Sequence, residues 1–138
     1  MDWNHYLSVK NEQVTKILLL SSLILLTACS SGYGHQAKGE NLSVYFMDKT
    51  DEGKAEKVAF YWKENGLITG KKQDLQIVKL SESHQLNIIK SFEGGQSIPF
   101  EERKLLLNLQ TKLEEEIFSD GLEIIICNDK FESIHKIN

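Results

Sequence analysis

Beyond residue 41, the spacing of apolar positions switches between the period of a strand and the period of a helix. Runs rich in β-branched and aromatic residues predict strands over residues 42–47, 75–80, 86–92, 122–127 and 131–137. In two intervening segments the apolar residues recur at the spacing of one helical face, which predicts two amphipathic helices. The predicted order is strand, helix, strand, strand, helix, strand, strand.

The first helix is expected to begin at Asp51, whose carboxylate would cap free backbone donors. Asn65 and Gly66 are expected to end it, because glycine takes the left-handed conformation that helix ends favour. Its buried face is predicted to carry Ala55, Val58, Ala59 and Trp62.

The second helix is expected to begin at Pro99, since a proline preorganises the first helical turn. Gly121 is expected to stop it. The predicted buried stripe consists of Leu106, Leu109, Leu113 and Ile117, with Leu105 alongside.

This succession of elements predicts an α+β fold, a two-layer sandwich with a ferredoxin-like strand-helix-strand-strand-helix-strand order and an extra C-terminal hairpin strand. Residues 42–138 are long enough for one domain with one modest core. Residues 29–41 contain three glycines and no apolar period, so we expect them to form a flexible tether.

The chain begins with a different pattern, in which Lys10 and Lys16 precede an apolar run over residues 17–26. A membrane-spanning helix needs roughly 20 apolar residues, so this run is too short to span. Its length and its basic flank are typical of a signal peptide, which we expect over residues 1–28. The alternative is a buried helix of the folded domain.

Leu26, Thr27, Ala28 and Cys29 follow this run and resemble the lipobox of bacterial lipoproteins. The resemblance implies cleavage before Cys29 and lipidation of its sulfur, so that acyl chains anchor the protein in a membrane. It also implies a position facing the periplasm. Ser30, where some lipoproteins carry an aspartate, resembles lipoproteins sorted to an outer membrane.

Charge narrows the choice of partners. The chain has 16 basic and 20 acidic residues and a net charge of −4. A mildly acidic domain has no electrostatic attraction to nucleic acid or to anionic lipid. We therefore expect no nucleic-acid partner, and membrane attachment through the lipid on Cys29 alone.

Lipidation of Cys29 would leave Cys127 unpaired. Cys127 ends an apolar strand, so we expect it to be a small buried hydrophobe. The alternative is a reactive thiol paired with His135 across the predicted hairpin.

Neither a metal nor a cofactor is expected. Glu114, Glu115 and Glu116 point about 100° apart on a helix, so they are predicted to form a solvated face. The other histidines of the predicted mature chain, His35 and His84, lack metal-ligand spacing. With no nucleophile or acid–base pair marked out, we expect no enzymatic activity.

Aromatic residues provide the best candidate for a partner surface. Phe60 and Tyr61 precede Trp62, but they project away from the predicted buried face of the first helix. Leu107 and Phe118 are placed on the outer side of the second helix. These four residues either form an apolar surface for a partner or belong to the core.

The sequence therefore favours a lipid-anchored, non-enzymatic binding or accessory protein of the bacterial envelope, whose partner is an envelope protein or peptidoglycan. A second hypothesis is a peptidoglycan-binding domain. The element order is similar to that of SPOR domains, and Lys90, Ser91 and Phe92 stand where such domains have a characteristic strand. A third is an inhibitor or immunity lipoprotein, because an acidic tethered domain attracts basic envelope-targeting hydrolases.

Overall fold

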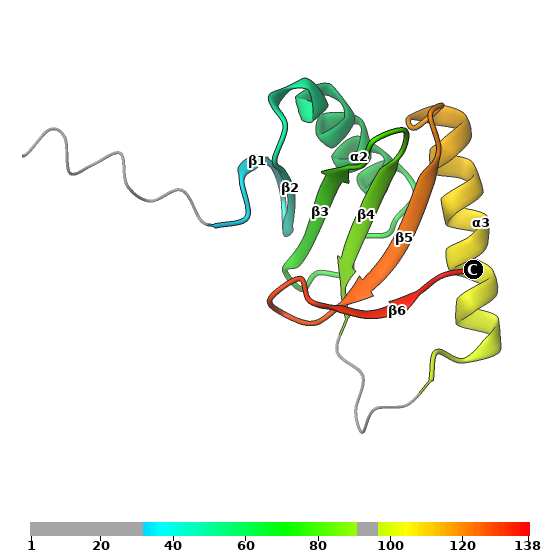
Figure 1. The fold of residues 1–138 in the computed structure, drawn as a ribbon. Coiled ribbons are helices and arrows are strands. Elements are labelled where there is room, and N and C mark those ends of the chain that lie inside the picture. The colour runs from blue at the N-terminus through cyan, green and yellow to red at the C-terminus, as the bar shows by residue number, and fades with distance from the viewer. Residues whose placement is uncertain (1–31, 91–96) are drawn as a thin grey trace, which may run out of the picture. The chain divides into compact units, whose positions relative to one another are not determined.

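The structure, a computed structural model, describes residues 32–90 and 97–138. The predicted signal peptide, Cys29 and Phe92 lie outside these residues. The described chain forms six strands and two α-helices, with one 3₁₀ turn (Figure 1). The strands are β1 (His35–Gly39), β2 (Leu42–Phe46), β3 (Gln73–Lys79), β4 (His84–Ile89), β5 (Leu122–Cys127) and β6 (Ser133–Lys136); the helical elements are η2 (Lys49–Asp51), α2 (Glu52–Glu64) and α3 (Phe100–Glu116).

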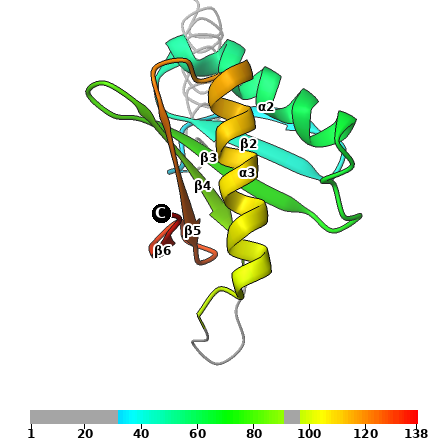
Figure 2. The same cartoon turned by 90° about the vertical axis from the view of Figure 1, so that its right-hand side faces the viewer.

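The six strands lie in the sheet in the order in which they occur along the chain. β2 pairs with β3, and β4 with β5, in parallel, whereas the other neighbours are antiparallel. Helices α2 and α3 connect the parallel neighbours and cover the same face of the sheet (Figure 2). The predicted α+β class and element order are thus confirmed.

The arrangement in space has a feature that the element order does not specify. Each helix joins two strands that are direct neighbours, with no strand between them. The two parallel pairs run in opposite directions, yet both helices lie on one face. The two crossovers therefore have opposite hands, and one is left-handed, which is rare in proteins.

The core lies between the helices and one face of the sheet. Alternate residues of the central strands point into it, as the strand period requires. Trp62 from α2 and Leu113 from α3 pack against them, and both are buried. The strand residues of this core are Leu42, Val44, Phe46, Leu75, Ile77, Leu86, Leu122, Ile124 and Ile126.

Neither α2 nor α3 covers the other face of the sheet, and no other α-helix is formed by residues 32–90 and 97–138. The centre of this face holds a polar network on β3 and β4, in which Gln85 donates to Asn87 at 2.6 Å and Asn87 donates to Gln76 at 2.9 Å. Asn87 and Gln76 are nonetheless buried. Their side chains satisfy one another, which lowers the cost of removing them from water.

The prediction of a flexible tether over residues 29–41 is wrong for residues 35–39. These residues form β1, an edge strand in antiparallel register with all of β2, from His35 opposite Phe46 to Gly39 opposite Leu42. The folded domain therefore starts earlier than residue 42. β1 lacks apolar alternation because it lies at the edge of the sheet, where its side chains are largely exposed.

Two local predictions about the helices also need correction. Asp51 makes no capping hydrogen bond from its side chain, whereas Asp48 caps η2 by accepting from the Thr50 N–H at 2.9 Å. Leu105, predicted to lie alongside the buried stripe, is 68% exposed. Leu113 is the fully buried member of that stripe, while Leu106, Leu109 and Ile117 are half-buried.

Candidate functional site

A groove of about 670 Å³ runs between α2 and the end of α3. Its apolar part consists of Phe60, Tyr61 and Ile117. Phe60 is 65% exposed, and Tyr61 and Ile117 are half-buried beside it, so the three side chains form a small apolar patch. The polar lining consists of Gly53, Glu56, Lys57, Glu64, Asn65 and Glu116.

The rim of this groove is acidic. Glu56, Glu64 and Glu116 contribute three carboxylates, against the single ammonium group of Lys57. Among the residues that the structure describes, no ion pair involves any of these three glutamates. The groove thus combines an exposed aromatic ring with an excess of negative charge.

Two of the four residues predicted to form a partner surface lie at this groove, Phe60 and Tyr61. Leu107 is half-buried against the core and does not line the groove. The prediction for Phe118 is wrong, because its side chain is fully buried. α3 ends at Glu116, and the Phe118 N–H bonds back to the Leu113 carbonyl at 2.9 Å, which turns the phenyl ring inward.

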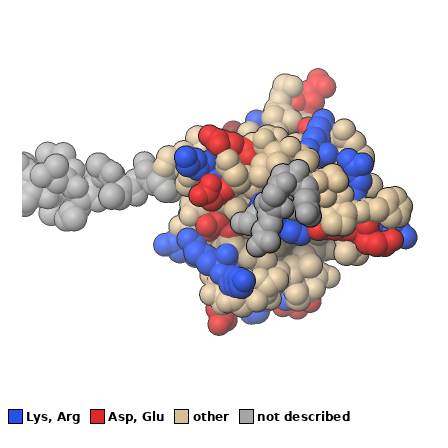
Figure 3. Space-filling view, turned by 90° about the horizontal axis from the view of Figure 1, so that it is seen from below, with Lys and Arg blue, Asp and Glu red and all other residues tan. Residues whose placement is uncertain are grey.

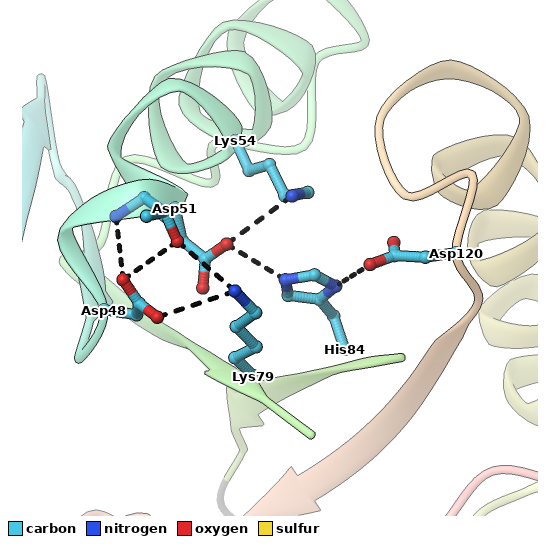
Figure 4. Close-up of polar contacts among 7 residues, drawn as sticks. Asp48, Asp51, Lys54, Lys79, His84 and Asp120 are labelled. Atoms are coloured by element: carbon cyan, nitrogen blue, oxygen red, sulfur yellow. Dashed lines mark hydrogen bonds and ion pairs between the residues drawn. The ribbon is translucent and has the colours of Figure 1, made fainter. Parts of the chain in front are cut away.

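A second cluster is buried where β4 begins (Figure 4). His84 is 1% exposed, and its Nε2 lies 2.9 Å from Oδ1 of Asp51, which is equally buried. Its Nδ1 lies 2.9 Å from Oδ2 of Asp120, which is 43% exposed in the loop between α3 and β5. The Lys54 ammonium also approaches Asp51 Oδ1, at 3.5 Å.

This cluster joins parts of the chain that are distant in sequence. Asp51 ends η2, His84 begins β4 and Asp120 precedes β5. Both carboxylate contacts are favourable when the imidazole carries protons on both nitrogens. Since both ring nitrogens face carboxylates and the ring is buried against Phe118 at 5.3 Å, the arrangement cross-links the fold and leaves no face of the ring for a substrate.

Sequence reasoning missed this cluster. Asp51 and His84 are 33 residues apart, and each has a plausible local interpretation, as a helix cap and as a turn residue. A buried aspartate and a buried histidine are both unusual, but the local sequence around each residue does not predict its burial. Pairing of the strand ends brings them together.

Beside this cluster, Asp48 lies at the surface between η2 and β3. The Thr50 N–H and hydroxyl donate to its carboxylate at 2.9 and 2.8 Å, and these hydrogen bonds lower its pKa. The Lys79 ammonium lies 3.6 Å from the same carboxylate and adds to the effect. The arrangement fixes η2 against the end of β3.

Cys127 is free and buried, and burial raises the pKa of its thiol to about 11. A nucleophilic cysteine requires a lowered pKa, so this environment does not suit the alternative of a reactive thiol. The strand register pairs Cys127 with Ser133 and His135 with Ile126, so the two residues are not direct partners.

The other residues considered for chemistry are dispersed. His35 lies on β1 beside Phe46, with 5.5 Å between their ring centres. Glu114 is half-buried and accepts a hydrogen bond from the Leu122 N–H at 2.9 Å, so it is not simply solvated, whereas Glu115 pairs with Lys112 at 3.3 Å. Within residues 32–90 and 97–138, no three metal-binding side chains converge.

Basic and acidic side chains are interspersed over the face of the domain shown in Figure 3. None of the helices that the structure describes is long and apolar enough to cross a membrane. Comparison of this chain with protein-family models, curated proteins and solved structures found no match.

Proposed function

We propose that this chain is a lipid-anchored protein of the bacterial envelope whose α+β domain binds a protein partner without catalysis. The anchor is the cysteine of the lipobox-like sequence Leu26, Thr27, Ala28 and Cys29. The binding surface is the groove between α2 and the end of α3. The observation that carries the proposal is the 65% exposure of Phe60, which lines that groove beside Tyr61 and Ile117.

The groove chemistry indicates what kind of partner it suits. An exposed aromatic ring gains free energy when a partner covers it, and aromatic residues commonly dominate binding energy at interfaces. The unpaired carboxylates of Glu56, Glu64 and Glu116 favour a cationic partner over an acidic one. The partner is therefore a protein surface that presents basic groups around an apolar side chain.

The same acidic rim favours one narrower function, inhibition of a basic hydrolase that attacks the envelope. Opposite charges accelerate the encounter of such partners and help to exclude acidic proteins. The peptidoglycan-binding hypothesis has no comparable support, since two of the three residues that suggested it, Ser91 and Phe92, lie outside the described residues.

The anchor is tested by the intact mass of the protein extracted from membranes. We expect a chain that begins at Cys29 and carries acyl groups, and a Cys29→Ser variant that carries none and leaves the membrane fraction. An unacylated protein that retains residues 1–28 would refute the anchor.

The groove is tested by placing a photo-crosslinking phenylalanine analogue at position 60 in living cells. The matched control is the same analogue at Leu105, which is equally exposed at 68% but lies outside the groove. We expect a discrete crosslinked envelope protein at position 60 only, and its loss when Glu56→Lys and Glu64→Lys reverse the rim charge. Identical crosslinks at both positions, no crosslink, or insensitivity to the charge reversal would each contradict the proposal.

A further inference from the structure

The start of the described domain is held in place by aromatic packing. The ring of Tyr33 contacts those of Tyr45 on β2 and Phe131 in the turn between β5 and β6, with ring centres 5.7 and 5.1 Å apart. Tyr45 and Phe131 also contact each other, at 5.9 Å. The three rings meet edge to face, which is a favoured geometry for aromatic pairs. We call these three residues the aromatic cluster.

The next residue adds a backbone constraint. Gly34 has a φ of +94°, a conformation that residues with a side chain rarely adopt. A Cβ at this position would lie 2.5 Å from the Phe46 carbonyl oxygen, so the chain passes directly against β2. β1 follows at once and is paired along its whole length. From Tyr33 onward, the chain therefore belongs to the folded domain.

The aromatic cluster lies on the face of the sheet opposite α2 and α3. Val44 and Phe46 point into the core under the helices, so Tyr45 between them points to the other face. Tyr33 and Phe131 pack against Tyr45 and share that face. The groove at Phe60 belongs to the helix layer, on the opposite side of the sheet.

Covalent geometry limits the distance between this face and the anchor. Four Cα–Cα steps separate Cys29 from Tyr33, and a fully extended chain of this length spans at most ~14 Å. The helix layer alone is about 10 Å thick. A domain lying on the bilayer through its helices would hold Tyr33 beyond both the helix layer and the sheet, too far for this connection.

We propose that the face of the sheet opposite α2 and α3 is turned toward the bilayer that holds the anchor, and that the half-buried rings of Tyr33 and Phe131 lie at the lipid headgroups, with Tyr45 buried beneath them. The inference rests on the lipidation of Cys29 proposed above. Tyrosine suits this position because its ring is apolar and its hydroxyl is polar, and aromatic residues concentrate at membrane interfaces. The groove on the helix layer then faces away from the membrane.

The test uses the acylated full-length protein in phosphatidylethanolamine–phosphatidylglycerol vesicles that contain lipids spin-labelled at the headgroup. A fluorophore is attached to Lys130→Cys, beside Phe131, or to the matched control Lys57→Cys in the groove; both lysines are exposed. Cys127 remains unlabelled because it is buried and its pKa is about 11. We expect several-fold stronger quenching at position 130 than at position 57.

A third sample inserts 20 glycine and serine residues between Ser31 and Gly32, which gives a root-mean-square reach of roughly 25 Å. We expect this insertion to reduce the difference between the two positions, since the longer connection no longer restricts orientation. Equal quenching in the original protein, stronger quenching at position 57, or an unchanged difference after insertion would overturn the inference. Failure of the proposed anchor is distinguishable, because the protein mass would then lack acyl groups.

Discussion

Substitution of His84 by alanine is expected to destabilise the fold more than any single change at the surface. His84 and Asp51 are each 1% exposed and 2.9 Å apart, so the substitution leaves the Asp51 carboxylate buried without its main partner. Removing the partner of a buried carboxylate costs about 3–5 kcal/mol. Lys54 remains 3.5 Å from Asp51 and is 30% exposed, which favours the lower end of this range.

The cost of His84→Ala can be compared with that of Asp120→Ala. Asp120 contacts the other ring nitrogen at the same distance, but it is 43% exposed. Exposed ion pairs contribute roughly 0–1 kcal/mol, so Asp120→Ala should cost little. For a domain of this size, about 3 kcal/mol corresponds to a fall in Tm of roughly 12 °C. Two contacts of equal length thus differ several-fold in their effect because they differ in burial.

The free energy of unfolding can be measured by urea denaturation followed through the fluorescence of Trp62, which is buried. Part of the stability lost in His84→Ala comes from lost packing against Phe118. A double-mutant cycle with Asp51→Asn separates this part, because Asp51→Asn keeps the side-chain shape but removes the charge. His84→Ala should cost at least ~1 kcal/mol less in the Asp51→Asn background. Equal costs for His84→Ala and Asp120→Ala, or strict additivity in the cycle, would refute this reasoning.

Four further changes test other parts of the fold. Leu113→Ala removes a fully buried side chain and should cost about 2–5 kcal/mol in urea denaturation, whereas Leu105→Ala should be nearly neutral. Gly34→Ala should destabilise by about 1–3 kcal/mol and expose β1 amides to hydrogen exchange, because its Cβ meets the backbone of β2. Cys127 should react with a thiol reagent at pH 8 only after unfolding. Because burial raises the pKa of its thiol to about 11, the thiol ionises more readily in the unfolded chain, and the free energy of unfolding should fall as the pH rises from about 9 to 11. The lowered pKa of Asp48 predicts the opposite pH dependence: its ionised carboxylate stabilises the fold above pH ~4, and this stabilisation is lost as the pH falls further. In thermal melts between pH 6 and pH 2.5, the Tm of Asp48→Asn should therefore fall less than that of the original protein.

The hydrophobic pattern was sufficient for the elements that bury side chains. β5 spans residues 122–127, as the run of leucine and isoleucine predicts. The end of α2 follows from Gly66, whose φ is +64°. In both cases the information is local, because an apolar run or a glycine restricts the chain wherever it lies.

Where the prediction failed, the deciding interaction came from elsewhere in the chain. β1 has a polar sequence and is a strand because β2 offers it an unpaired edge. The helical period, extended to Phe118, predicts an outward side chain, but α3 ends two residues earlier, and beyond that point the period no longer indicates direction. Asp51 was assigned to a local cap, whereas its partner lies 33 residues away.

The shorter connection changes how the proposed binding site is presented. With Cys29 as the proposed anchor, a 13-residue tether would let the groove sample every direction, including the membrane, whereas a connection of ~14 Å would restrict the domain to orientations with Tyr33 near the lipid. A compact domain of this size has a radius of gyration of about 13 Å, so the groove stays within roughly 50 Å of the bilayer. Under the proposed anchoring, a partner would have to come within this distance of the bilayer, which is consistent with the proposed partner being a protein of the envelope. In the proposed orientation, the acidic rim would lie away from the lipid and stay accessible to a basic partner.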